Sequence, residues 1–313
     1  MSVNLPRVYA SAFSHRDWVS QLDEACSQWG CFYLHEHGVD TALLQRFEAV
    51  AAAFFEQPRH VKQRIERTAH NAWGYYDREL TKNRLDWKEI FDVGPTAQGG
   101  PMAGSTPQWP EHPTAFRSVV EATYAALETV ALNLLSGISE ALGMPPQALD
   151  QGFRENATSF LRLNHYPPCT APESHLGISP HTDAGALTVL VHDAQPGLEF
   201  RHEGLWKAVD PVADALVVNI GDIVQVWSND RYRAPEHRVR ANAAKHRYSA
   251  PFFLNPSYET DYAPLESLLS NTIPKYRSIN WGAFRAGRAA GDYADAGEEI
   301  QISQFRYDQN DVS

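Results

Sequence analysis

Apolar positions in the first half of the chain recur at helical spacing. Residues 16–29 and 41–55 each carry an apolar stripe along one side, and residues 115–142 carry the longest one. Gly143 and Pro145 end that last stretch. Residues 31–34 predict a short strand, and residues 97–113, rich in glycine and proline, predict a loop. The pattern therefore indicates a mainly helical α/β region over residues 1–150.

After Gln151 the period of the apolar positions changes to two. The runs that predict strands lie near 158–166, 186–192, 205–209, 215–219, 223–228, 236–240 and 246–254. Short strands without intervening helices favour an antiparallel sandwich or jelly roll, which we place at residues 151–257. Residues 258–313 return to loops and helical pieces and are expected to cap one mouth of the sandwich. We expect a single catalytic domain over residues 1–313.

Composition narrows the class of protein. The chain has 313 residues, of which 43% are hydrophobic and 21% charged, enough for a substantial core. Its net charge of −11 comes without long runs of one sign, so no nucleic-acid partner is expected. Three cysteines without a CxxC pair argue for a reducing compartment. With no apolar run near ~18 residues and no signal peptide, we expect a cytoplasmic protein, without a membrane partner and monomeric.

The first candidate metal-binding motif is His181-Thr182-Asp183, and a further histidine, His237, follows later in the chain. Side chains at i and i+2 of a strand point to one face, so His181 and Asp183 can hold one metal ion together. His237 must then arrive from another strand. Two imidazoles and one carboxylate leave coordination positions open, which suits a non-haem Fe(II) oxygenase. A lone His-x-Asp pair is common by chance, and the same three ligands also suit zinc.

A second polar group accompanies the histidines. Arg247 and Ser249 share one strand face, and so do Arg162, Asn164 and Tyr166. Inward polar side chains are costly unless they line a site. A guanidinium offers a planar donor fork that matches a carboxylate, and a serine hydroxyl adds a third donor. Together with the metal ligands, these residues predict a pocket for a metal and a small carboxylate.

Several segments along nearly the full length carry a resemblance. They are Trp29-Gly30-Cys31-Phe32-Tyr33, His37-Gly38-Val39, Asp86-Trp87-Lys88-Glu89, residues 163–169, 181–188, 219–222, 228–230, 237–239, 247–249 and 291–299. On these segments the sequence resembles the isopenicillin N synthase-like branch of the Fe(II)/2-oxoglutarate-dependent oxygenases. The resemblance implies a mainly β fold with flanking helices and a double-stranded β-helix core.

The resemblance also implies a division of roles. Fe(II) would bind His181, Asp183 and His237, and the distal carboxylate of 2-oxoglutarate would bind Arg247, Ser249, Tyr166 and Asn164. The cosubstrate would be decarboxylated with O2 to succinate and CO2, while an unactivated C–H bond of a small molecule is oxidised. Hydroxylation is the usual outcome, with desaturation or cyclisation as variants, and ascorbate is expected to stimulate turnover.

Two alternatives stay open. Isopenicillin N synthase and the ethylene-forming amine-cyclopropane oxidase share these motifs and use no 2-oxoglutarate. A zinc hydrolase or a non-catalytic metal-binding protein would also use two histidines and an aspartate. Against that second alternative, the sequence places no general base beside the triad, and the inward Arg-x-Ser pair would have no purpose.

Residues for substrate contact are harder to choose. Arg162 lies on the inward face and either touches substrate or cosubstrate or forms a buried structural ion pair. Tyr75, Arg84 and Phe252 lie where this family often shapes its pocket, although Phe252 is also a simple core candidate. His165 alternates away from Tyr166 and is expected to face outward. The sequence does not name the substrate.

Overall fold

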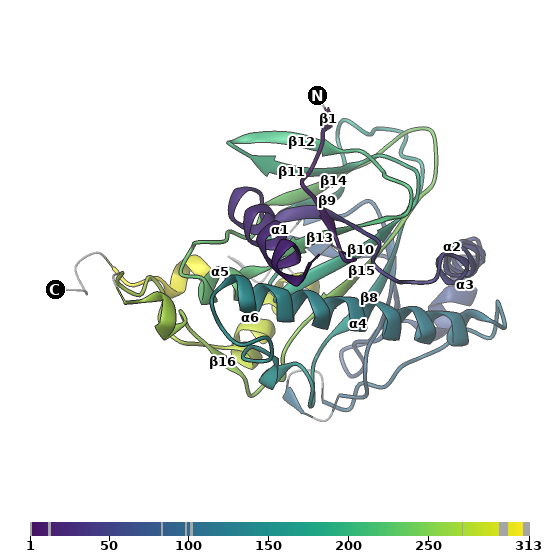
Figure 1. Cartoon of the computed structure of the whole chain (residues 1–313). Helices are drawn as coiled ribbons and strands as arrows, with labels where there is room; N and C mark the ends of the chain where they lie inside the picture. Colours follow the sequence, from purple (N-terminus) through teal and green to yellow (C-terminus); the bar gives the residue numbers. More distant parts are fainter. Residues whose placement is uncertain are drawn as a thin grey trace.

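The computed structural model describes residues 2–11, 14–82, 84–97, 99–100, 103–270, 272–293 and 300–308. Two β-sheets lie at its centre, and the long helix α4 (Phe116–Ala141) runs along the outer face of the larger sheet (Figure 1). This arrangement confirms the predicted jelly-roll core with flanking helices.

The larger sheet has eight strands. In spatial order they are β2 (Arg7–Tyr9), β3 (Cys31–His35), β13 (Ala215–Ile220), β10 (Leu187–His192), β15 (Arg247–Leu254), β8 (Phe160–Tyr166), β7 (Glu89–Val93) and β4 (Gly74–Tyr76). The smaller sheet has five, namely β1 (Ser2–Val3), β12 (Leu205–Val209), β11 (Leu198–His202), β14 (His237–Arg240) and β9 (Leu176–His181). Two short pairs stand apart: β5 (Leu80–Thr81) with β6 (Arg84–Leu85), and β16 (Asp261–Tyr262) with β17 (Ile279–Asn280).

Helices α1 (His15–Gln28), α2 (Thr41–Phe55) and α4 confirm the three predicted amphipathic stretches. The other α-helices of the described residues are α3 (Arg59–Lys62), α5 (Asp222–Trp227) and α6 (Trp281–Tyr293). The side chains of Ser14 and Asp40 accept hydrogen bonds from the first turns of α1 and α2, which fixes where both helices begin. Among the described residues, no helix is long and apolar enough to cross a bilayer.

Two apolar clusters fill the interior. The larger one packs α1, α2 and α4 onto the larger sheet, with Phe54, Phe116 and Leu134 fully buried. The smaller one joins residues of both sheets, including Tyr33, Tyr166 and Phe200. Because the smaller cluster fills only part of the space between the sheets, side chains further along the same strands can line a cavity.

The structure differs from the sequence prediction in several elements. Residues 223–228 were predicted as a strand, but all of them except Ser228, the C-cap, lie in helix α5, since a short apolar run does not distinguish a strand from a buried helix. Strands β9 and β11 were not predicted. The first 150 residues also contribute strands to both sheets, so they do not form a separate helical layer.

Candidate active site

Three potential metal ligands converge at one end of the space between the sheets. In the described chain, ligand atoms of His181, Asp183 and His237 all lie within 4.8 Å of one another. The Nε2 atoms of His181 and His237 lie 3.6 Å and 3.7 Å from Oδ1 of Asp183. Pairing of β14 with β9 sets the two histidines opposite each other, with ring centroids 4.3 Å apart. This spacing suits one metal ion held by all three.

Both imidazoles are oriented by the backbone. Nδ1 of His181 donates to the carbonyl oxygen of Ser179 at 2.8 Å, and Nδ1 of His237 to that of Pro235 at 3.2 Å. A proton on each Nδ1 leaves the Nε2 lone pair directed at the shared centre. Burial, and next the charge of His237, lower the pKa of His181 to about 3, so this ring is neutral at physiological pH.

Asp183 presents one oxygen to the same centre. Its Oδ2 accepts hydrogen bonds from Thr188 on β10 and from Nδ2 of Asn219 on β13, the latter at 2.8 Å, which leaves Oδ1 for a metal. Burial alone would raise the pKa of Asp183, but the two histidines and these hydrogen bonds lower it. A carboxylate and two imidazoles form the donor set expected for Fe(II).

The backbone path between the first two ligands differs from the one expected. Strand β9 ends at His181, so Asp183 lies in the following turn rather than on the strand. The amide of Asp222 donates to the carbonyl oxygen of Asp183 at 2.8 Å, and the amide of Gly221 to that of Ala186 at 2.8 Å. The 219–222 segment thereby holds the turn in place.

The Arg-x-Ser pair faces the same space from the larger sheet. Pairing of β15 with β8 sets Arg247 opposite Tyr166 and Ser249 opposite Asn164. The Arg247 guanidinium lies 4.9 Å from the centroid of the Tyr166 ring, and its Nη1 lies 3.4 Å from Oγ of Ser249. All four side chains are buried, as their inward alternation predicted.

Two buried atoms of this group lack partners. Nε of Arg247 and Oδ1 of Asn164 have no hydrogen-bond partner within the described structure, and no described carboxylate forms an ion pair with Arg247. A buried cation without a counter-ion is unfavourable. The site therefore fits a bound dianion such as 2-oxoglutarate.

A cavity of about 170 Å³ connects the two groups. Its described lining residues include the metal ligands, Asn164, Tyr166, Arg247 and Ser249, and an apolar wall of Ile178, Leu190, Leu198, Phe200 and Val239. Arg162 also lines the cavity, as do Glu79 and Lys88.

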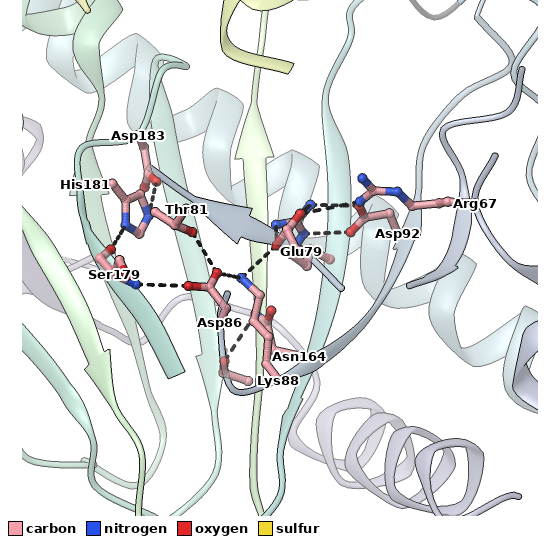
Figure 2. A network of polar contacts seen from close by, with 12 residues as sticks. Arg67, Glu79, Thr81, Asp86, Lys88, Asp92, Asn164, Ser179, His181 and Asp183 are labelled. Atoms are coloured by element: carbon pink, nitrogen blue, oxygen red, sulfur yellow. Dashed lines mark hydrogen bonds and ion pairs between the residues drawn. The ribbon is translucent and has the colours of Figure 1, made fainter. Parts of the chain in front are cut away.

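Arg162 belongs to a buried ion-pair network beside the cavity. Figure 2 labels other members of this network, namely Arg67, Glu79, Asp86, Lys88 and Asp92. Its guanidinium donates to both oxygens of Asp92 at 2.8 Å and to Glu79 at 2.8 Å. Lys88 bridges Glu79 and Asp86 at 2.7 Å and 2.9 Å, and Arg67 contacts Asp92 at 2.7 Å. Three acidic and three basic groups balance, so the structure favours the ion-pair interpretation of Arg162 over direct substrate contact.

This network reaches the metal ligands through Asp86. The backbone amide of Ser179 donates to Oδ1 of Asp86 at 3.2 Å, and the Ser179 carbonyl orients His181 (Figure 2). Thr81 donates to Oδ2 of the same carboxylate at 2.7 Å. Asp86 thus ties the loop that carries β5 and β6 to the strand that ends at His181.

Three predicted substrate contacts lie elsewhere. Tyr75 is buried on the far face of the sheet, where its hydroxyl donates to Glu89 at 2.6 Å. Arg84 is exposed on β6. Phe252 packs in the core against Tyr124, and its neighbour Phe253 lines the cavity instead, because adjacent strand residues face opposite sides.

His165 points away from the cavity, as predicted, but it is buried rather than exposed. Its ring bonds to Glu89 at 2.6 Å and to His246 at 2.7 Å, beneath helix α2. The prediction of an outward face was right about the direction and wrong about the exposure, because α2 covers that face of the sheet.

Helix α6 supplies residues of the cavity wall that the sequence did not predict. Trp281, Arg285 and Arg288 all border the cavity. Their i, i+4, i+7 spacing is a detectable helical signal, but it does not reveal which element the helix faces. Thr188 and Asn219 were part of recognised segments without an assigned role, and both hold Asp183.

Known proteins share these features. Residues 157–256 match the family described as the 2OG-Fe(II) oxygenase superfamily, and residues 3–112 match the non-haem dioxygenase in morphine synthesis N-terminal family. The chain is 35% identical to oxoglutarate-dependent flavonoid 7-O-demethylase 1 of Ocimum basilicum, over 86% of this chain and 72% of that protein. It is 33% identical to gibberellin 2-beta-dioxygenase 5 of Oryza sativa subsp. japonica, over 96% and 87%.

Solved structures agree with the sequence matches. The crystal structure of JOX2 in complex with 2OG, Fe and JA has a TM-score of 0.81 and 30% identity, and covers 91% of this chain and 85% of that one. The 2-oxoglutarate-dependent interpretation is therefore supported over the oxidase alternative. With its His-x-Asp…His centre and a buried arginine that pairs with no described carboxylate, the chain belongs to the 2OG-Fe(II) oxygenase superfamily and is an Fe(II)- and 2-oxoglutarate-dependent dioxygenase.

Proposed function

We propose that His181, Asp183 and His237 hold Fe(II), and that Arg247 and Ser249 bind the distal carboxylate of 2-oxoglutarate. Tyr166 and Asn164 complete the carboxylate site. The observation that carries this assignment is the buried Arg247 guanidinium, which has no acidic partner in the described chain and lies beside the metal ligands. A carboxylate between Arg247 and Ser249 would supply the missing counter-ion.

The residues of the chain prepare the centre and keep it dry. Backbone carbonyls fix the tautomers of both histidines, and Thr188 and Asn219 direct one oxygen of Asp183 at the metal position. Leu190, Leu198 and Phe200 exclude water from the cosubstrate. When bound, iron and 2-oxoglutarate supply the oxidation chemistry that uses O2 and yields succinate and CO2.

The remaining space serves a small-molecule substrate with an oxidisable C–H bond. We propose hydroxylation, with desaturation or cyclisation as variants, and ascorbate as a stimulant. The names of relatives support a small organic substrate: one is a gibberellin dioxygenase and JOX2 was solved with JA. Three buried free cysteines support a reducing, cytoplasmic location, and we propose a monomer without nucleic-acid or membrane partners.

Anaerobic spectroscopy tests the assignment. Fe(II) and 2-oxoglutarate added together should produce the visible metal-to-ligand charge-transfer band of a chelated 2-oxo acid. H237A should lose the band, whereas H175A, which removes an exposed histidine outside the cavity, should retain it. Absence of the band in the unmodified protein, or its persistence in H237A, would contradict the proposed sites.

A further inference from the structure

Helix α6 forms a cationic wall of the pocket. Trp281, Arg285 and Arg288 lie one helical turn apart and all line the cavity. The helix packs against β5, whose residues Leu80 and Thr81 also line it. Residues far apart in the sequence therefore meet at the part of the cavity that the metal and 2-oxoglutarate sites leave for a substrate.

Arg288 is held in place beside the metal ligands. Its Nη2 donates at 2.7 Å to the carbonyl oxygen of Thr182, the residue between His181 and Asp183. Its guanidinium lies 5.9 Å from the ring centroid of Phe284, and the side chain is buried. Arg285 lies one turn earlier on α6 and is half-buried. Two positive charges thus lie on the helix face that borders the reaction centre.

The other charged groups of the cavity wall already have roles. Glu79, Lys88 and Arg162 belong to the balanced network. Asp183 is assigned to iron and Arg247 to 2-oxoglutarate. Among the described lining residues, this leaves the two α6 guanidiniums, and cations in a partly enclosed pocket attract an anion. Both have partners within the chain, but a guanidinium carries five N–H donors, so it can bind a ligand carboxylate in addition.

The rest of this space is apolar and aromatic. Phe160 and Phe253 stack with ring centroids 4.7 Å apart, and both line the cavity. Trp281 is fully buried, and its indole N–H donates to Thr158 at 2.9 Å, which fixes the ring. Rigid aromatic walls favour a flat ring or a hydrocarbon chain.

We infer that the primary substrate is a small carboxylic acid with an apolar ring or chain. Its carboxylate binds at Arg285 and Arg288, and its apolar part lies against Phe160 and Phe253. This inference deepens the proposed function and rests on it, because the C–H bond to be oxidised must face the iron that His181, Asp183 and His237 hold.

Matched acids and amides test the charge requirement. Anaerobic protein loaded with Fe(II) and saturating 2-oxoglutarate is titrated with benzoic, phenylacetic, cinnamic and indole-3-acetic acids and with their primary amides. Saturating 2-oxoglutarate keeps these acids away from Arg247. Binding is measured as the change in the visible band. At least one acid should bind about tenfold more tightly than its amide, as expected for a charge-assisted contact.

Variants identify the residue responsible. R285Q should abolish the preference for the acid, R285K should keep part of it, and the exposed-site control R277Q should leave it unchanged. Retention of the band with Fe(II) and 2-oxoglutarate shows that each variant is folded. Equal binding of acids and amides, no binding of any acid, or an unchanged preference in R285Q would overturn the inference. If Fe(II) and 2-oxoglutarate gave no band in the unmodified protein before any acid was added, that result would instead contradict the proposed function.

Discussion

At the scale of single residues, Arg247 combines a charge with a planar donor fork. R247K keeps the charge and loses the fork, so the 2-oxoglutarate concentration for half-maximal succinate release should rise about tenfold. Iron binding should not change, because Arg247 does not contact the metal ligands. The control is R240K, at a residue whose side chain is 58% exposed. Equal 2-oxoglutarate affinity in R247K and the unmodified protein would argue against the role of the fork.

Arg162 should matter mainly for stability. R162M removes one cation from a buried network and leaves Asp92 and Glu79 partly uncompensated. The free energy of unfolding should fall by about 3–5 kcal/mol, measured by urea denaturation, with little change in 2-oxoglutarate affinity. R117M, at an ion pair with Glu121 whose side chains are 63% and 49% exposed, should cost less than about 1 kcal/mol. A stable R162M that fails to turn over substrate would instead support direct substrate contact.

The sequence predicted the site residues that belong to short motifs in a characteristic order. Strand alternation and motif order identified the metal triad and the Arg247 pair, although Asp183 proved to lie in a turn. Ion pairs between distant residues, such as Glu79 with Arg162, leave no periodic signal. Tyr75 and Phe252 were misplaced because residue type alone does not say which face of a sheet is the pocket.

At the scale of elements, the 219–222 segment controls the turn that carries Asp183. A Cβ on Gly221 would meet the carbonyl oxygens of Gly185 and Asp183, the latter at 2.9 Å. G221A should therefore displace Asp183, weaken Fe(II) binding and cost about 1–3 kcal/mol of stability. Anaerobic Fe(II) titration and thermal unfolding measure the two effects. G204A, where no atom lies within 4 Å of the added Cβ, is a control for added bulk but carries strain from its positive φ. Unchanged metal affinity in G221A would contradict the role of this turn.

The carboxylate of Asp230 holds residues 300–308, the last segment that the structure describes, through Arg306. Burial alone would raise the pKa of Asp230, but hydrogen bonds from Tyr276, Arg306 and Gln225 lower it to about 2. A lowered pKa means that Asp230 stabilises the fold above the ordinary value of 3.8 and that this contribution is lost as the pH falls toward 2. R306Q should move the midpoint of acid unfolding to higher pH, measured by circular dichroism. R201Q, at an exposed ion pair, should leave it unchanged, and an unshifted midpoint in R306Q would refute the contribution.

Helices α1, α2 and α4 were predictable because one face of each meets solvent and the other packs on the core. Strands β8 and β15 are largely buried, and their alternation comes from polar residues that face the pocket. Residues 223–227 of α5 are almost entirely buried, and so short a run, apolar except for Gln225, carries no period from which to choose. β9 was missed because its polar residues serve the site rather than a solvent face.

At the scale of the whole molecule, the proposed ligands join the two sheets. His181 and His237 belong to the smaller sheet, and Arg247 and Ser249 to the larger. Fe(II) and 2-oxoglutarate at about 100 times their dissociation constants should each add about 2.7 kcal/mol to stability. Anaerobic thermal unfolding should show a midpoint several degrees higher with both ligands, and EDTA should reverse the part due to iron. R247K, with about tenfold weaker 2-oxoglutarate binding, should lose about half of the 2-oxoglutarate increment. An unchanged midpoint of the unmodified protein with both ligands would contradict ligand binding between the sheets.

The jelly-roll architecture was predictable from the sequence, but which strands join each sheet was not. Closely spaced short strands after residue 151 indicated the jelly roll. The joining of β1 to the smaller sheet and of β2, β3, β4 and β7 to the larger one depends on contacts between distant residues. The same is true of α6, which was expected only as part of a cap and forms a wall of the pocket.

The position of α6 in the chain has a consequence for protein synthesis. The ribosome releases the metal ligands and the Arg247 pair before it releases Trp281, Arg285 and Arg288. Until α6 has emerged, a nascent chain lacks both the wall of the pocket that α6 forms and the hydrogen bond from Arg288 to the Thr182 carbonyl beside the metal ligands. The pocket can therefore be completed only late in synthesis, after most of the chain has left the ribosome.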